Sequence, residues 1–252
     1  MSPPDHLSVS QVTTYLGCPR KYRFRYIDKL ESEVKSAGLA FGSAVHTAIE
    51  WWQGERIAGR EPDPERALRM FRADWSAQLA DPLLDLEEKA PEELSAMGEI
   101  LVRLFIERFN GEKPPIAVEQ RFEVDLIDPR TGGQLPVPLV GYLDGVGDGV
   151  VWELKTAARK TPVSDYALQL AAYTHAVRQT TGERPVIRVV ELIKTKVPKI
   201  EVEEVIVSER DEAWFVEVAC EVWSAVQAGV FPPVTSGNSD GFCPETLTVA
   251  SR

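Results

Sequence analysis

Cysteine is scarce in this chain: only Cys18, Cys220 and Cys243 occur among 252 residues, and they lie far apart. So few scattered cysteines do not make the disulfide framework of a small secreted protein. The sequence also lacks any apolar run near the ~20 residues that a membrane-spanning helix requires. Its first residues contain no apolar segment of the kind found in signal peptides. We therefore expect a cytoplasmic protein that makes no membrane contact.

Positive charge is in the minority, since 28 Lys and Arg face 39 Asp and Glu and leave a net charge of -11. An even distribution would argue against nucleic-acid binding, but residues 20–29 concentrate basic side chains between aromatic rings. A local basic patch can bind phosphate whatever the net charge, and rings can stack on unpaired bases. This segment is either a solvated face or a DNA contact, and the rings favour the second. The predicted nucleic-acid-binding residues are Arg20, Lys21, Tyr22, Arg23 and Arg25.

The most informative stretch runs over residues 141–156, where two short apolar segments flank Asp148-Gly149. That dipeptide is a strong signal for a two-residue hairpin turn, because glycine adopts positive φ without steric cost. The resulting register places Asp144 opposite Glu153, with Lys155 on the same face as Glu153. Like charges directly opposite each other are destabilising, so the pair is either a site for a bound cation or a solvated polar face with Lys155 as a surface salt-bridge partner.

Two helical stretches carry further polar residues at short spacing. Gln169 and Tyr173 are four residues apart, so they share one face of a helix. Gly42 lies one turn before His46 and leaves room for another element to approach closely. By themselves, His46, Gln169 and Tyr173 could equally be structural residues of the core.

Four motifs, in this order along the chain, resemble those of the PD-(D/E)XK nuclease superfamily: Gly42-x-x-x-His46, Gly141-x-x-Asp144, Glu153-x-Lys155 and Gln169-x-x-x-Tyr173. The resemblance is to the RecB-like branch, which includes the nuclease domains of RecB and AddB and CRISPR-associated exonucleases. It covers about residues 7–232, and the segments at 7–10 and 18–22 resemble the N-terminal signature of that branch.

The resemblance implies a divalent-metal site. Its metal ligands would be His46, Asp144, Glu153 and the backbone carbonyl of Leu154, with Glu119 an additional candidate that could equally be an exposed strand residue. Carboxylate and water ligands suit Mg²⁺ or Mn²⁺, and the imidazole favours Mn²⁺ more than an all-oxygen site would.

The same resemblance implies the roles of the remaining polar groups. The catalytic residues would be Asp144, Glu153, Lys155, Gln169 and Tyr173. Lys155 would orient or deprotonate the attacking water, or neutralise the scissile phosphate. Gln169 and Tyr173 would contact the DNA backbone or organise the catalytic groups.

The periodicity predicts one α/β domain over residues 1–252. Its core is a mixed sheet flanked by helices, with a loop-like C-terminal tail at 231–252. The resemblance implies that this core is restriction-endonuclease-like and that residues 55–112, approximately, are a helical insertion. Residues 31–40 are predicted to be a loop and residues 41–60 a helix. Many relatives in the branch hold a [4Fe–4S] cluster with four cysteines, but only Cys18 and Cys243 match those positions. We therefore expect no iron–sulfur cluster.

These observations predict a metal-dependent DNA nuclease, an exonuclease acting on single-stranded or frayed ends in recombination, repair, or phage- or CRISPR-related DNA processing. Recombination or replication proteins are candidate partners. The alternative is a weakly catalytic or non-catalytic DNA-binding subunit of a recombination or CRISPR-adaptation complex. A hydrolase of another phosphodiester is a third possibility. Polarity, strand preference, endonuclease or exonuclease mode, metal number and oligomeric state do not follow from the sequence.

Overall fold

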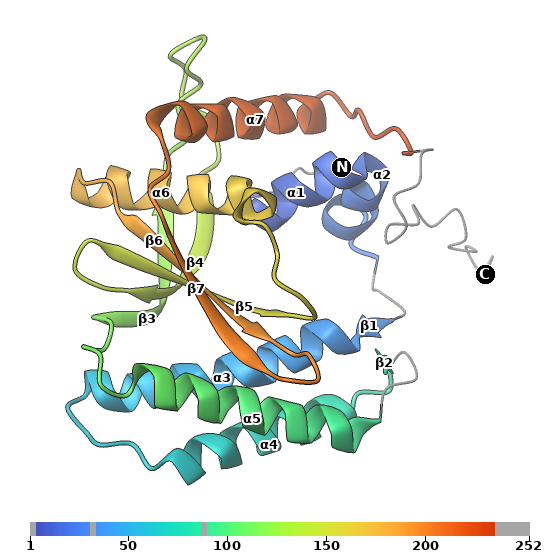
Figure 1. Cartoon of the computed structure of the whole chain (residues 1–252). Coiled ribbons are helices and arrows are strands. Elements are labelled where there is room, and N and C mark those ends of the chain that lie inside the picture. Colours follow the sequence, from blue (N-terminus) through green and yellow to red (C-terminus); the bar gives the residue numbers. More distant parts are fainter. Residues whose placement is uncertain (1–3, 31–33, 87–89, 235–252) are drawn as a thin grey trace. The chain divides into compact units, whose positions relative to one another are not determined.

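The computed structural model describes residues 4–30, 34–86 and 90–234 (Figure 1). The chain forms two compact units. The first, here called the sheet unit, contains residues 33–121 and 142–207; the second, here called the terminal unit, contains residues 1–32, 122–141 and 208–252. Most of the predicted C-terminal tail, residues 235–252, lies outside the described residues.

A five-stranded mixed sheet has the strand order β3-β4-β5-β6-β7. Strand β5 pairs in parallel with β6 and antiparallel with β4, while β6 and β7 are antiparallel. This mixed sheet with helices on its faces confirms the predicted α/β fold class. The strands are β3 (Ala117–Val124), β4 (Leu139–Val146), β5 (Val150–Ala157), β6 (Val186–Ile193) and β7 (Lys199–Val205).

Three helices of the sheet unit form one layer: α3 (Ala37–Ile57), α4 (Pro64–Leu79) and α5 (Pro91–Phe109). Their starts are locally encoded, because Asp63 caps α4 and a proline occupies the first turn of both α4 and α5. The predicted loop at 31–40 needs correction. Lys35 and Ser36 form β1, which pairs in parallel with β2 (Leu84–Asp85), and α3 already begins at Ala37. The Ser36 hydroxyl caps that helix by accepting from the Gly38 N–H at 3.1 Å.

The core of the sheet unit lies between these helices and the sheet. Trp152 and Leu154 of β5 belong to a buried cluster with large side chains of α3, α4 and α5, including Trp52 and Phe105. Burying each such side chain contributes roughly 1.5–3 kcal/mol. Because side chains alternate along a strand, Glu153 and Lys155 face away from this three-helix layer.

The opposite face of the sheet is covered by α6 (Ala167–Thr181), which follows the 3₁₀ turn Val163–Tyr166. Figure 1 shows α6 and α3 on opposite sides of the strands. Helix α6 ends where Gly182 adopts a left-handed conformation with φ 80°, which glycine tolerates without strain. The buried positions of α6 include Tyr173, so this helix directs a polar residue toward the face that carries Glu153.

The terminal unit contains α1 (Val9–Gly17), α2 (Pro19–Tyr22), the π-helical turn Arg23–Ile27 and α7 (Glu209–Gln227). Ser8 caps α1, and the Tyr15 hydroxyl donates to the Val230 carbonyl at 2.7 Å just beyond α7. In the described part of the chain, no helix is long and apolar enough to cross a membrane.

Candidate active site

The hairpin between β4 and β5 sets the backbone of the site. Gly149 has φ 69° in the turn, as expected for the Asp148-Gly149 dipeptide. The ladder pairs Val146 with Val151 and Gly145 with Trp152, which is the register that the turn predicts. One position further along, the Leu154 N–H donates to the Asp144 carboxylate at 2.7 Å rather than to the backbone of β4. The site thus lies where the Asp144 side chain accepts a hydrogen bond from the backbone of β5.

A closed ring of hydrogen bonds joins four side chains that the sequence motifs had singled out. Lys155 Nζ forms an ion pair with Glu153 and donates to the side-chain oxygen of Gln169 at 3.0 Å. The Gln169 amide donates to the Tyr173 hydroxyl at 2.7 Å. Tyr173 in turn is hydrogen-bonded to Glu153. With its amide nitrogen facing Tyr173, Gln169 leaves the phenol proton directed at Glu153, so the Tyr173 hydroxyl accepts from one neighbour and donates to the other.

Glu153 is nonetheless incompletely satisfied. Its side chain is buried at 1% exposure, and its Oε2 atom has no hydrogen-bond partner. Burial, followed by the charge of Asp144, raises the pKa of Glu153 to about 7. Burial also raises the pKa of Asp144 to about 6, although the Leu154 N–H opposes this shift. Two carboxylates are thus held where neither ionises readily without a nearby cation.

His46 approaches the site from α3, on the opposite side of β5 from the ring. A Cβ on Gly42 would lie 3.0 Å from the Thr156 hydroxyl, so the glycine permits α3 to approach β5 closely, as the sequence predicted. The His46 ring is hydrogen-bonded to the backbone of Leu154, and burial lowers its pKa. The neutral imidazole that burial favours is the form that ligates metals.

A second acidic pair lies next to Asp144. Glu50 and Glu119 line a small cavity together with His46, Asp144 and Leu154. Burial raises the pKa of Glu119, and the charges of Glu50 and Glu153 raise it further. The backbone of Glu119 is left-handed, with φ 46°, a conformation that is unusual for a residue other than glycine. The sequence analysis missed Glu50, although its position four residues after His46 places both on one face of α3.

A third buried acid, Glu191 on β6, was also missed. It lies beside Lys155 in the parallel register of β5 and β6. Its carboxylate accepts from the Thr161 N–H at 3.2 Å and from the Tyr166 hydroxyl at 2.8 Å. The Tyr166 ring in turn lies 5.5 Å from Lys155 Nζ, so Glu191 holds an aromatic ring against the lysine.

The donor set fits a hard divalent cation. Asp144, Glu153 and the Leu154 carbonyl offer oxygen ligands, and His46 offers an imidazole nitrogen. The unpaired Glu153 Oε2 is a buried acceptor that a cation would satisfy. Over residues 4–30, 34–86 and 90–234, no three His, Cys, Asp or Glu side chains stand close enough together to hold a metal ion as they are now oriented. Lys155 engages one Glu153 oxygen, and the Leu154 N–H engages Asp144.

The basic residues predicted to bind nucleic acid belong to the terminal unit. Tyr22, which we expected to stack on a base, is instead fully buried in the core of this unit, and its hydroxyl donates to Gln11 at 3.1 Å. Arg23 pairs with Asp28 at 3.1 Å. Arg20, Lys21 and Arg25 are at least partly exposed, so a role in binding phosphate stays a prediction for them.

The cysteine prediction concerns two residues. Cys18 is buried in the terminal unit, where its Sγ accepts from the Lys21 N–H at 3.4 Å and caps α2. Cys243 lies outside the described residues. The absence of an iron–sulfur cluster therefore stays a prediction.

Comparison with known proteins agrees with this architecture. The family model of the PD-(D/E)XK nuclease superfamily matches residues 6–245, nearly the whole chain. The chain therefore belongs to this superfamily. Members of this superfamily are in general hydrolytic nucleases that act on DNA and use divalent metals such as Mg²⁺.

Individual relatives are more distant. The crystal structure of a protein from Eubacterium rectale, named "Putative exonuclease", superposes with a TM-score of 0.60 at 19% identity, covering 94% of this chain and 86% of that chain. At this identity the likeness concerns the fold. Gene 69 protein of Mycobacterium phage L5 is 36% identical over 72 residues, which are 29% of this chain and 24% of that protein. The matched segment thus spans only about a quarter of that curated relative.

Proposed function

We propose that this chain is a divalent-metal-dependent exonuclease of the RecB-like branch, which degrades DNA from single-stranded or frayed ends. The observation that carries the proposal is the Glu153 carboxylate, which is bound by Lys155 and Tyr173 on one side and left with an unpaired, fully buried oxygen on the other. A structural glutamate at 1% exposure has no reason to leave an acceptor unsatisfied.

In this proposal Asp144, Glu153, His46 and the Leu154 carbonyl hold Mg²⁺ or Mn²⁺, with Glu119 and Glu50 as additional acids nearby. When bound, the ion would lower the pKa of a coordinated water and offset negative charge on the phosphate. The chain's own contribution is to hold the ligand atoms in place and to exclude bulk water from Glu153.

Lys155 has two roles in the proposal. It neutralises part of the acidic cluster, and it presents an ammonium group that can orient the attacking water or contact the scissile phosphate. Gln169 and Tyr173 act through Lys155 and Glu153, because the hydrogen-bond ring fixes the rotamers of both. They are therefore positioning residues.

Two similarities support the exonuclease mode and the RecB-like branch. The ordered motifs resemble that branch, and the Eubacterium rectale protein of the same fold is named as an exonuclease. The similarity to a phage protein is compatible with a role in phage DNA processing. Contacts of Arg20, Lys21 and Arg25 with DNA belong to the same proposal.

One assay tests the proposal directly. DNA labelled at either end, single-stranded or duplex with blunt or frayed ends, is incubated with Mg²⁺, Mn²⁺ or EDTA. We expect metal-dependent release of short products from single-stranded ends and none in EDTA. Circular single-stranded DNA is the control, since an exonuclease cannot start on it. Tight DNA binding without cleavage under any metal would favour the alternative, a non-catalytic DNA-binding subunit.

A further inference from the structure

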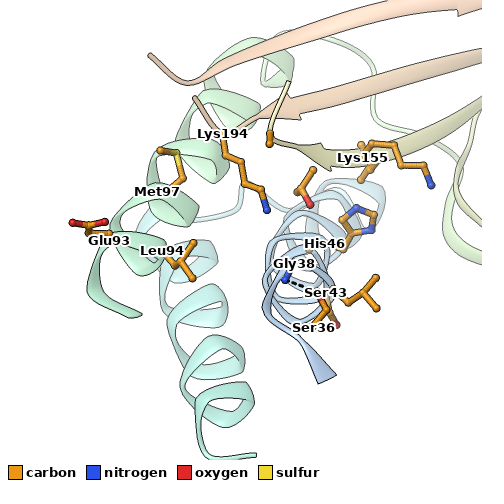
Figure 2. A pocket seen from close by; sticks show the side chains of 14 residues that line it. Ser36, Gly38, Ser43, His46, Glu93, Leu94, Met97, Lys155 and Lys194 are labelled. Atoms are coloured by element: carbon orange, nitrogen blue, oxygen red, sulfur yellow. Dashed lines mark hydrogen bonds between the residues drawn. The ribbon is translucent and has the colours of Figure 1, made fainter. Parts of the chain in front are cut away.

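A cavity of about 790 Å³ opens beside His46 and Lys155 within the sheet unit. It lies between the first half of α3 and the start of α5, and the ends of β5 and β6 border it. Figure 2 shows Leu94 and Met97 on one side, His46 and Ser43 on the other, and the side chain of Lys194 extending into the space between them. Its volume is within the roughly 300–1,000 Å³ of ordinary ligand sites.

The lining differs in charge from the protein as a whole. The chain carries a net charge of -11, yet the charged residues lining this cavity are two lysines, Lys155 and Lys194, and the single acid Glu93. The Lys155 ammonium is bound to Glu153 and Gln169, so the positive charge that extends into the cavity is that of Lys194. Apolar surface accompanies the positive charge, since Leu94 and Met97 line the cavity and Leu39 is 75% exposed at its edge. Cations next to exposed apolar side chains suit a chain of phosphates that carries unpaired bases. A duplex, whose bases are stacked internally, offers no surface to such apolar groups.

Lys194 is held in place rather than swinging freely. Its backbone N–H donates to the Ala157 carbonyl at 2.8 Å, which continues the parallel pairing of β5 and β6. Its ammonium lies 4.7 Å from the centroid of the Phe41 ring on α3. The stem and the charge of Lys194 are therefore both directed over α3, into the cavity that leads to His46.

We propose that this cavity is a subsite for the single DNA strand that leads to the scissile phosphate, with Lys194 binding one backbone phosphate and the apolar lining of Leu39, Leu94 and Met97 supporting unpaired bases. This inference rests on the proposed nuclease function, because it takes the cluster around Glu153 as the place of cleavage. It adds a specificity-determining residue from outside the metal cluster and the hydrogen-bond ring, and it assigns the preference for single strands to the apolar lining.

A matched pair of variants tests the role of Lys194. Lys194→Met removes the charge but keeps an unbranched stem over Phe41. Lys196→Met makes the same change two residues away, at an exposed position that does not line the cavity. Binding of a fluorescent single-stranded oligonucleotide is followed by anisotropy in EDTA, so that no cleavage intervenes. We expect Lys194→Met to bind about tenfold more weakly, with a salt slope reduced by about 0.7, as for one lost phosphate contact on a single strand. Lys196→Met should match the wild type, and Lys194→Arg should retain most of the affinity.

A second arm changes the DNA instead of the protein, and compares the wild type with Lys194→Met. Oligonucleotides carrying one neutral methylphosphonate linkage at successive positions from the end are compared for binding. One position should weaken binding by wild type about as much as Lys194→Met does, and the same substitution should cost Lys194→Met little more. Equal sensitivity of both proteins at every position, or equal affinities of Lys194→Met and Lys196→Met, would overturn the subsite.

Kinetics then separate the subsite from the function. In a protein that cleaves DNA, Lys194→Met should raise KM about tenfold on single strands and leave kcat within about twofold. If no metal supports cleavage but binding still depends on Lys194, the proposed function fails and the subsite stands. If cleavage is normal and Lys194→Met has no effect on KM, the subsite fails and the function stands.

Discussion

Two buried glutamates on neighbouring strands of the same sheet have opposite surroundings. Glu191 on β6 accepts hydrogen bonds from the Thr161 N–H and the Tyr166 hydroxyl, and no buried oxygen of its carboxylate lacks a partner. Glu153 on β5 is buried as deeply, at 1% against 4% exposure, but keeps one oxygen without a partner. Glu191 anchors the segment between β5 and α6. The free oxygen of Glu153 is available to a ligand from outside the chain.

The comparison shows how to separate a structural acid from a functional one when both are buried. A structural carboxylate is surrounded by donors, because an unmade hydrogen bond in the interior costs about 1–3 kcal/mol. Glu153 has one such unmade hydrogen bond. The nearby charge of Asp144 also disfavours its ionised form and raises its pKa. A bound cation would remove both unfavourable contributions, because it would bind the unpaired oxygen and neutralise the like charges.

The largest expected effect separates the two glutamates by activity. Glu153→Gln and Asp144→Asn each keep an acceptor for the neighbouring donors but remove a negative charge, so we expect cleavage to fall below detection. Glu191→Gln should retain activity within about tenfold, because its partners lie on the loop rather than at the metal cluster. Rates on end-labelled single-stranded DNA at saturating Mn²⁺ measure the difference. Full activity of purified, folded Glu153→Gln would remove the proposed site.

The next effect concerns Lys155, which contacts both Glu153 and the Tyr166 ring that Glu191 orients. Lys155→Met should lower kcat by roughly two to four orders of magnitude, the range of a positioned acid–base group. Metal affinity, measured by calorimetry, should stay largely intact. A collapse of metal affinity with full recovery of the rate at saturating metal would show that Lys155 is structural.

A smaller effect sharpens the comparison through stability. Glu191→Ala leaves the Thr161 N–H and the Tyr166 hydroxyl without their acceptor, so the free energy of unfolding should fall by about 1–3 kcal/mol. Asp144→Asn removes a like charge next to Glu153 and should leave stability unchanged or slightly higher in EDTA. Urea unfolding of both variants in parallel measures this. A loss in Asp144→Asn as large as in Glu191→Ala would mean that both acids are structural.

The smallest expected effect is a pH dependence of apo stability. Burial raises the pKa of Asp144 to about 6 and of Glu153 to about 7, above their ordinary values of 3.8 and 4.5. Between about pH 4 and 7 the folded protein therefore holds protons that the unfolded chain has released, and the free energy of unfolding contributed by these groups falls as pH rises. The same protons compete with metal, so metal affinity should increase over that range.

Urea titrations in EDTA at several pH values check this dependence. The double variant Asp144→Asn with Glu153→Gln is the control, because it lacks both titrating groups and should show a flatter dependence. Identical pH profiles for the wild type and this variant would rule out the proposed linkage.

The sequence by itself determined what depends on neighbouring residues. The Asp148-Gly149 turn set the register of β4 and β5, and the spacing of Gln169 and Tyr173 put both on one face of α6. Gly42 correctly predicted a close approach to α3, because a Cβ at this position would lie only 3.0 Å from the Thr156 hydroxyl. Turn geometry and helix periodicity act over a few residues, so they can be read without knowing the fold.

The tertiary structure decided what depends on residues far apart in the chain. The packing of strands and helices set three features of the site: the hydrogen bond from Lys155 to Gln169, the proximity of Glu50 and Glu119 to Asp144, and the position of Lys194 in the cavity. Burial also depends on the tertiary structure. It shows that Tyr22 is a core residue and that Glu191 is a buried acid that anchors a loop. Desolvation depends on the whole surrounding structure, so no local pattern could have separated Glu191 from Glu153.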